Sequence, residues 1–253
     1  MQKDTLIGAV VILVVLAGIG FYAAMTPAPA QAPGAQTALP LPAGSYSEHA
    51  DYYDIATNYA TSTPLAGEAN AAAIALMQDF VSDTITQFKS DGDFANLTAQ
   101  DIKMMGYDQG RKQQLQILYL IAPSGRTISY IFTIYTDTLG AHGNTFFKTF
   151  TFDKASGAAL DLVDIFTSES TYLNTLSQIS RAKLPVTIGD GFDMTFIADG
   201  TTPKEENFAN FFFDTSDLVF VFPPYQVAPY SAGPQTLRIP LSDLSSILKP
   251  EYR

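Results

Sequence analysis

The sequence predicts an α+β fold: an antiparallel sheet with helices packed on one face, preceded by one N-terminal transmembrane helix. Short runs with alternating apolar residues predict strands, and a longer stretch with apolar residues at three- and four-residue spacing predicts an amphipathic helix. Neither a βαβ rhythm nor an internal repeat connects these segments. An antiparallel sheet with helices against one face is the simplest arrangement that buries both kinds of apolar stripe.

The first element is an uncharged apolar run at residues 6–25, long enough to cross a hydrocarbon core of about 30 Å as a helix. Residues 1–5 precede it and carry Lys3, so we expect a short cytoplasmic segment and an extracytoplasmic C-terminal part at the cell membrane. The alternative is a signal peptide, because the small residues Ala28-Pro29-Ala30 would allow cleavage after Ala30 and secretion.

Residues 26–44 carry no charge and are mostly alanine and proline, which predicts a semi-rigid linker. The folded extracytoplasmic domain is expected over residues 45–253. If it has subregions, they are residues 45–139 and 140–253.

Within this domain, a strand is expected at residues 52–59. A helix is expected at residues 67–89, where Ile74, Met77, Phe80, Val81, Ile85 and Phe88 form one face. Two strands at residues 113–122 and 127–136 are joined by the tight-turn sequence Pro123-Ser124-Gly125-Arg126, which predicts an antiparallel hairpin. A third strand at residues 145–152 has Phe146, Phe150 and Phe152 on one face and Phe147 and Thr149 on the other.

A second helix is expected at residues 168–184, with Ser168 or Ser170 as its cap and Pro185 closing it. A short element follows at residues 192–198. Residues 218–222 form a strand that must end at Pro223 and Pro224, which cannot donate backbone hydrogen bonds. The chain stays irregular until a second strand begins at residue 236, and residues 242–248 form a short helix.

Composition excludes several functions. The formal net charge of −11 argues against nucleic acid as a partner and favours cationic or neutral partners. There is no cysteine, which excludes disulfides and thiolate chemistry. No G-x-S-x-G elbow, phosphate loop or dinucleotide fingerprint occurs, and the start of a calcium loop at Asp91-Gly92-Asp93 lacks the required glycine and glutamate further on.

Four segments carry a family resemblance: GAHGN at residues 140–144, FDKASGAALDLVDIF at 152–166, STYLNTLSQISRAKL at 170–184 and FVFPPYQVAPYSAGP at 220–234. Together they resemble the extracytoplasmic domain of RsiV-type anti-sigma factors, which also resembles the accessory region of certain peptidoglycan deacetylases. The resemblance covers most of residues 45–250. It implies a domain of largely unknown function that binds host lysozyme in the anti-sigma factor.

Two activities linked to this family are expected to be absent. Residues 1–5 are too short to fold into a segment that holds a sigma factor. The deacetylases carry a separate metal-dependent domain with an aspartate and paired histidines, whereas this chain has only His49 and His142. We therefore expect no enzyme activity, no metal and no cofactor.

The candidate ligand-binding residues are Tyr225, Tyr230, His142 and Asn144. His142 lies in a loop where Gly140 and Gly143 are expected to supply positive φ, so its ring either hydrogen-bonds the turn or contacts a ligand. The tyrosine rings either pack on the sheet or form a rigid, proline-fixed contact surface.

The sequence thus predicts a membrane-anchored binding or sensing module at the bacterial cell envelope. Its partner is a lysozyme-like basic protein or cell-wall glycan. The alternatives are a secreted form of the same module and an envelope polysaccharide hydrolase or deacetylase with an unrecognised carboxylate site. The sequence does not predict an oligomeric state.

Overall fold

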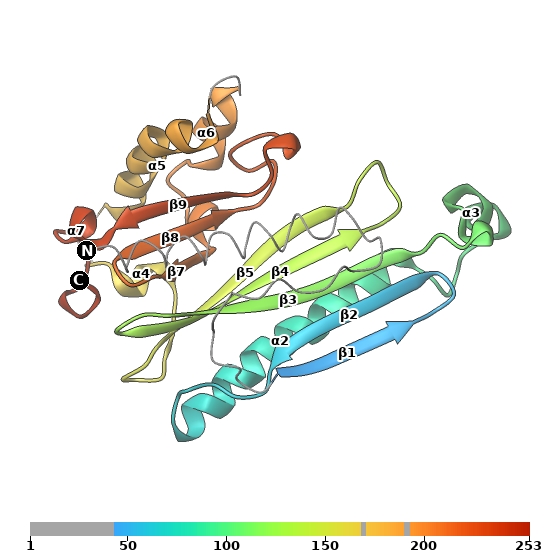
Figure 1. Ribbon diagram of the computed structural model, residues 1–253, viewed down its shortest axis with the longest axis horizontal. Helices are drawn as coiled ribbons and strands as arrows, with labels where there is room; N and C mark the ends of the chain where they lie inside the picture. Colours follow the sequence, from blue (N-terminus) through green and yellow to red (C-terminus); the bar gives the residue numbers. More distant parts are fainter. Residues whose placement is uncertain (1–42, 168–170, 190–192) are drawn as a thin grey trace, which may run out of the picture.

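A computed structural model of the protein describes residues 43–167, 171–189 and 193–253 (Figure 1). The predicted membrane span at residues 6–25, and Ser168 and Ser170, lie outside these residues. Within the described ranges, no helix is both long and apolar enough to cross a membrane.

The strands are β1 (Ala43–His49), β2 (Tyr53–Ala60), β3 (Gln113–Pro123), β4 (Thr127–Asp137), β5 (Asn144–Asp153), β6 (Ala159–Leu160), β7 (Phe211–Phe213), β8 (Asp217–Phe222) and β9 (Gln235–Pro240). The helices are α2 (Gly67–Gly92), α3 (Ala99–Met105), α4 (Leu162–Ile165), α5 (Tyr172–Ile188), α6 (Met194–Gly200) and α7 (Leu241–Leu244), and short 3₁₀ turns lie at η1 (Tyr107–Gln109), η2 (Glu205–Phe208), η3 (Tyr230–Ala232) and η4 (Pro250–Tyr252).

The larger sheet has six strands in the order β1-β2-β3-β4-β5-β6. The predicted β3–β4 hairpin is confirmed, with Gln114 opposite Asp137 and Pro123 opposite Ile128. The prediction of a purely antiparallel sheet is wrong, because β2 and β3 pair in parallel. Helix α2 lies between them in the chain and carries it back to the end where β2 began, as a parallel connection requires.

Helix α2 covers one face of this sheet, as the sequence predicts. Its buried residues Ala73, Met77, Val81 and Phe88 form a single stripe. This stripe packs on residues of β2 to β5, among them Ile55, which is fully buried.

The opposite face of the large sheet packs against a second sheet, of strands β7-β8-β9, and is not exposed to solvent there. Phe212, Val219 and Val221 of this small sheet pack against Ile131 and Phe147 of the large one. Helices α4, α5, α6 and α7 lie on the far side of the small sheet, whereas α3 lies beside one end of the large sheet (Figure 1). The predicted placement of all helices on one face of one sheet is therefore corrected to two sheets packed together, with helices on both outer sides.

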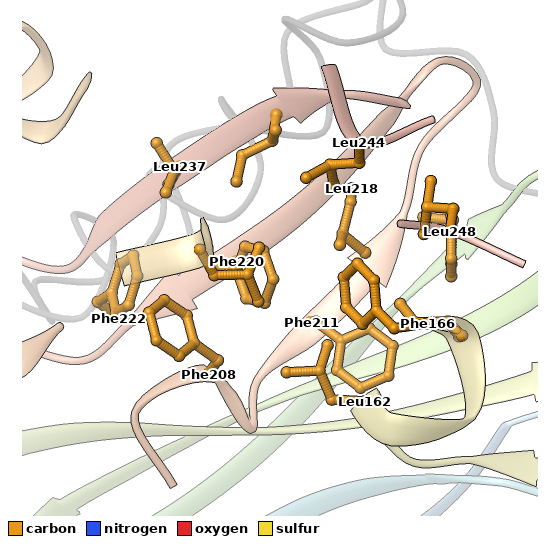
Figure 2. Packing of buried hydrophobic residues seen from close by; sticks show 14 of the residues in the cluster. Leu162, Phe166, Phe208, Phe211, Leu218, Phe220, Phe222, Leu237, Leu244 and Leu248 are labelled. Carbon is orange, nitrogen blue, oxygen red and sulfur yellow. The ribbon is translucent and has the colours of Figure 1, made fainter. Parts of the chain in front are cut away.

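The far side of the small sheet forms the second main core. Figure 2 shows aromatic and leucine side chains from β7, β8 and β9 that meet residues of the surrounding helices and turns. The labelled residues are Leu162, Phe166, Phe208, Phe211, Leu218, Phe220, Phe222, Leu237, Leu244 and Leu248. Because alternate residues of β8 point into this core and into the inter-sheet core, every residue of the strand after Asp217 is apolar.

Helix α5 continues through Pro185 to Ile188, so the prediction that Pro185 closes the helix is wrong. Proline removes one helical hydrogen bond, but Leu176 and Leu184 are fully buried and Ile188 packs against the same core. Tertiary packing therefore offsets the lost bond. The predicted helix at residues 242–248 is also shorter than expected, since α7 ends at Leu244 and the chain turns to place Leu248 opposite Phe166.

The Tyr130 hydroxyl is fully buried under α2 and has no hydrogen-bond partner among the described residues. Burial, reinforced by Tyr119, raises the pKa of this phenol. A buried hydroxyl without a partner is destabilising, so Tyr130→Phe should raise the free energy of unfolding by about 1 kcal/mol. Urea unfolding followed by tyrosine fluorescence measures this. Tyr252→Phe is the matched control and should lower it by about 1 kcal/mol, because that hydroxyl donates to Asp153.

Glu48 fastens β1 to the helix layer. Its carboxylate accepts hydrogen bonds from Lys89 and Tyr53, at 2.5 Å each, and from Tyr46. The Lys89 ammonium, with the two phenols, lowers the pKa of Glu48 from 4.5 to about 2.

This stabilisation is therefore complete above pH about 4.5 and is lost as the pH falls towards about 2. At neutral pH, Glu48→Gln should lower the free energy of unfolding by about 1 kcal/mol. Urea unfolding of both proteins over a pH series measures the difference. A difference that fails to shrink below pH about 4 would contradict the assignment.

Candidate functional site

Three of the four predicted site residues come together where the loop between β8 and β9 meets the loop between β4 and β5. The imidazole of His142 stacks on the ring of Tyr230, with centroids 3.8 Å apart and planes at 20°. The Tyr225 ring lies 6.2 Å from the imidazole and 5.6 Å from the Tyr230 ring. We call these three rings the aromatic platform.

Hydrogen bonds and ring stacking together hold the aromatic platform in place. His142 Nδ1 lies 3.0 Å from the carbonyl oxygen of Gly143, which also accepts a hydrogen bond from the Tyr230 hydroxyl at 3.0 Å. His142 Nε2 lies 3.1 Å from the Tyr225 hydroxyl. The neutral tautomer that suits both contacts carries its proton on Nδ1, so that Nε2 accepts from the phenol. Both ring nitrogens of His142 are therefore engaged within the cluster.

The loop between β8 and β9 is held stiffly. Tyr225 has a positive φ of 72°, which is uncommon for a residue with a side chain, and its backbone N–H donates to Ala228 at 3.0 Å. The Gln226 side-chain amide donates to the carbonyls of Gly200 and Asn207, at 3.0 and 2.9 Å. Tyr225 itself remains 48% exposed. The loop thus holds one tyrosine face in solvent at a fixed position.

The loop between β4 and β5 corrects one prediction about its glycines. Positive φ occurs at Leu139 (63°), and at neither Gly140 nor Gly143. Gly143 has a different role: a Cβ there would lie 2.3 Å from the hydroxyl oxygen of Tyr135, so the Tyr135 side chain would have to shift. The absence of a side chain lets the backbone approach Tyr135 and the platform closely.

Asn144, the fourth predicted residue, is the exposed first residue of β5 and pairs with Thr136 across the hairpin. Its side chain makes no hydrogen bond with any described residue, so it does not join the network. In the described ranges, no cluster of three His, Cys, Asp or Glu residues could hold a metal ion.

The sequence analysis missed a groove of about 790 Å³ between α2 and the ends of β3, β4 and β5. Its rim carries Asp83, Gln87 and Asp91, which recur every four residues along α2. This polar stripe beside an apolar one was a visible signal, but such stripes usually mark a solvated helix face.

Residues 163–242 match the model of a family described as "Protein of unknown function (DUF3298)". The match begins in α4, ends in α7 and includes Tyr225 and Tyr230. His142 lies outside it.

The expected likeness to a peptidoglycan deacetylase is confirmed. The chain is 34% identical over 143 residues to peptidoglycan-N-acetylmuramic acid deacetylase PdaC of Bacillus subtilis, covering 56% of this chain and 31% of PdaC. It is 25% identical over 128 residues to the immunogenic protein MPT64 of Mycobacterium tuberculosis, covering 51% of this chain and 54% of MPT64. The chain thus spans about half or less of the length of these relatives.

The fold itself occurs in a crystal structure of a DUF3298 family member from Bacteroides fragilis. The TM-score is 0.61 at 15% sequence identity, and the match covers 83% of this chain and 93% of the other. Residues 163–242 therefore resemble the DUF3298 family in sequence, and the chain shares its fold with that solved protein.

Proposed function

We propose that this protein is a binding module of the bacterial cell envelope that holds cell-wall glycan on the aromatic platform. The observation that carries the proposal is the half-exposed ring of Tyr225, fixed by His142 and by a proline-flanked loop. A tyrosine held rigidly offers an apolar face and loses little conformational entropy on binding. The name of PdaC, a deacetylase of peptidoglycan, gives the same ligand class.

A second candidate partner is a lysozyme-like basic protein. The net charge of −11 favours it, because an acidic surface attracts cations over a distance and speeds their association. The resemblance to RsiV-type domains is the other support. Such binding should weaken as salt screens the charges, whereas stacking of a neutral glycan should respond little.

We further propose that residues 6–25 anchor the module in the cell membrane and that the described part lies outside it. Cleavage after Ala30 would release the same module, and N-terminal sequencing of the mature protein distinguishes the two forms.

The engagement of both His142 nitrogens within the cluster supports binding over hydrolysis. Peptidoglycan that stays intact during incubation, with and without divalent metal, would agree with this.

The test is co-sedimentation of the full chain, in detergent, with purified peptidoglycan sacculi. Tyr225→Ala should weaken retention about tenfold, as expected for the loss of a central aromatic contact. Tyr225→Phe keeps the ring and should lose much less. Tyr46→Ala removes a tyrosine of similar exposure from β1 and should leave retention unchanged.

Raising the salt from about 0.05 to about 0.5 M separates the two partners. Retention on sacculi that persists in salt and depends on Tyr225 supports glycan binding. Retention on immobilised lysozyme alone, lost in salt, would favour the basic protein. If Tyr225→Ala and Tyr46→Ala are retained equally on sacculi and equally on immobilised lysozyme, the aromatic platform is not the binding site.

A further inference from the structure

The groove beside α2 exists because the helix covers only part of its sheet. Helix α2 lies over β2 and β3 and leaves one end of β4 and β5 open (Figure 1). The floor there is apolar and includes Ile134, Phe88 and Phe146. Phe146 is 48% exposed, although its strand neighbour Phe147 is buried against the other sheet. A volume of about 790 Å³ is within the range of pockets that bind ligands.

The rim of the groove carries two carboxylates on α2. Asp83 and Asp91 stand on the same stripe of α2, and neither forms an ion pair with any described residue. Between them, Gln87 donates to Asp91 at 2.6 Å. Lys148, on the same face of β5, lies over the Phe150 ring at 5.2 Å and not against these carboxylates. The rim is thus suited to a ligand that brings its own cations.

The border of the groove is an open strand edge. Strand β5 pairs along its length with β4, but on its other side β6 pairs only with Thr151 and Phe152. Residues 144–150 therefore have no strand partner on that side among the described residues, and Phe146 of this segment lines the groove. An unpaired edge is a template for an additional strand from another chain.

The spacing of the charges fits a strand. Asp83 and Asp91 are eight residues apart in a helix, which is about 12 Å along its axis. In an extended peptide, residues i and i+4 point to the same face and are about 13 Å apart. Two basic residues at these positions can meet both carboxylates, with the intervening residue i+2 over the apolar floor.

We propose that this groove binds an extended peptide segment with basic residues at i and i+4 and an apolar residue at i+2. The main chain of the peptide pairs with the free edge of β5. Its basic side chains pair with Asp83 and Asp91, and its apolar side chain packs on Phe146. This site lies on the opposite face of the β4–β5 hairpin from the aromatic platform and does not depend on it.

The experiment measures binding of labelled synthetic peptides to the full chain by fluorescence anisotropy. The main probe is the acetylated and amidated peptide Lys-Thr-Val-Thr-Lys-Thr, with its lysines at i and i+4. A second peptide of the same composition places the lysines at i and i+3, on opposite faces of a strand. A third carries N-methyl groups on the backbone amides that would pair with β5. We expect the main probe to bind at least tenfold more tightly than either of the others.

Two double variants complete the test. Asp83→Asn with Asp91→Asn should weaken binding of the main probe at least tenfold. Glu68→Gln with Asp79→Asn removes the same charge from exposed positions of α2 outside the groove and should change it less than twofold. Equal losses of affinity in both variants would mean that the peptide is attracted by the overall acidic charge of the protein and not by the groove. Equal binding of the N-methylated peptide would overturn strand addition, and no binding of the main probe would overturn the proposal.

Discussion

Replacing Asp153 by alanine is expected to lower the free energy of unfolding by about 3–5 kcal/mol. The side chain of Asp153 is 1% exposed, yet it accepts hydrogen bonds from Arg126, from the Tyr252 hydroxyl and from the backbone N–H groups of Ala155 and Ser156. Its removal leaves these donors without an acceptor inside the protein. It also frees the C-terminal turn, which Tyr252 holds against the end of β5.

The lowered pKa of Asp153 shows that its surroundings favour the charged carboxylate. Burial alone would raise this pKa, but the hydrogen bonds from Ser156, Arg126 and Ala155 outweigh burial and leave it lowered. Urea unfolding at neutral pH measures the loss. Asp243→Ala is the matched control, because its ion pair with Lys183 is exposed and should contribute less than about 1 kcal/mol. Similar losses in the two variants would contradict the role assigned to Asp153.

Gly200→Ala is expected to lower the free energy of unfolding by about 3 kcal/mol. Gly200 ends α6, and a Cβ there would lie 1.9 Å from the carbonyl oxygen of Gln226 and 2.7 Å from its carbonyl carbon. Both are backbone atoms, so rotation of a side chain cannot relieve the clash. The same substitution should separate Gln226 from α6 and so displace the neighbouring Tyr225.

Gly125→Ala is the control for this prediction, because a Cβ in the β3–β4 turn meets no atom within 4 Å. It should change the free energy of unfolding by less than about 0.5 kcal/mol. Sedimentation with sacculi provides a second readout, since Gly200→Ala should weaken retention at temperatures where the protein is still folded. If retention is unchanged, the position of the β8–β9 loop does not determine binding.

The sequence was a good guide to elements with a clear local period. The α2 stripe and the β3–β4 hairpin were predicted closely, because burial on one face imposes a regular pattern of apolar residues. Strand β7, with the sequence Phe-Phe-Phe, was missed because it is short and buried on both faces. Strand β1 was missed for the opposite reason, since it is mostly polar and holds to the fold through pairing and Glu48.

Local patterns in the sequence could not show which residues and strands far apart in the chain come together. The parallel pairing of β2 with β3 depends on where α2 returns the chain, which no local pattern encodes. His142 and Tyr225 were singled out separately, but they are 83 residues apart and the sequence could not show that their side chains meet. The groove beside α2 was missed because it results from what the helix leaves uncovered.

The core between the two sheets joins residues inside the segment that matches the family model to residues before that segment. Phe212, Val219 and Val221 lie inside the matched segment, whereas Ile131 and Phe147, which cover them, lie before it. If residues 163–242 were cut out alone, one apolar face of the small sheet would be exposed to water, which invites aggregation. The matched segment therefore depends on the strands from β3 to β5 to bury its small sheet, and we expect a stable fragment to include those strands.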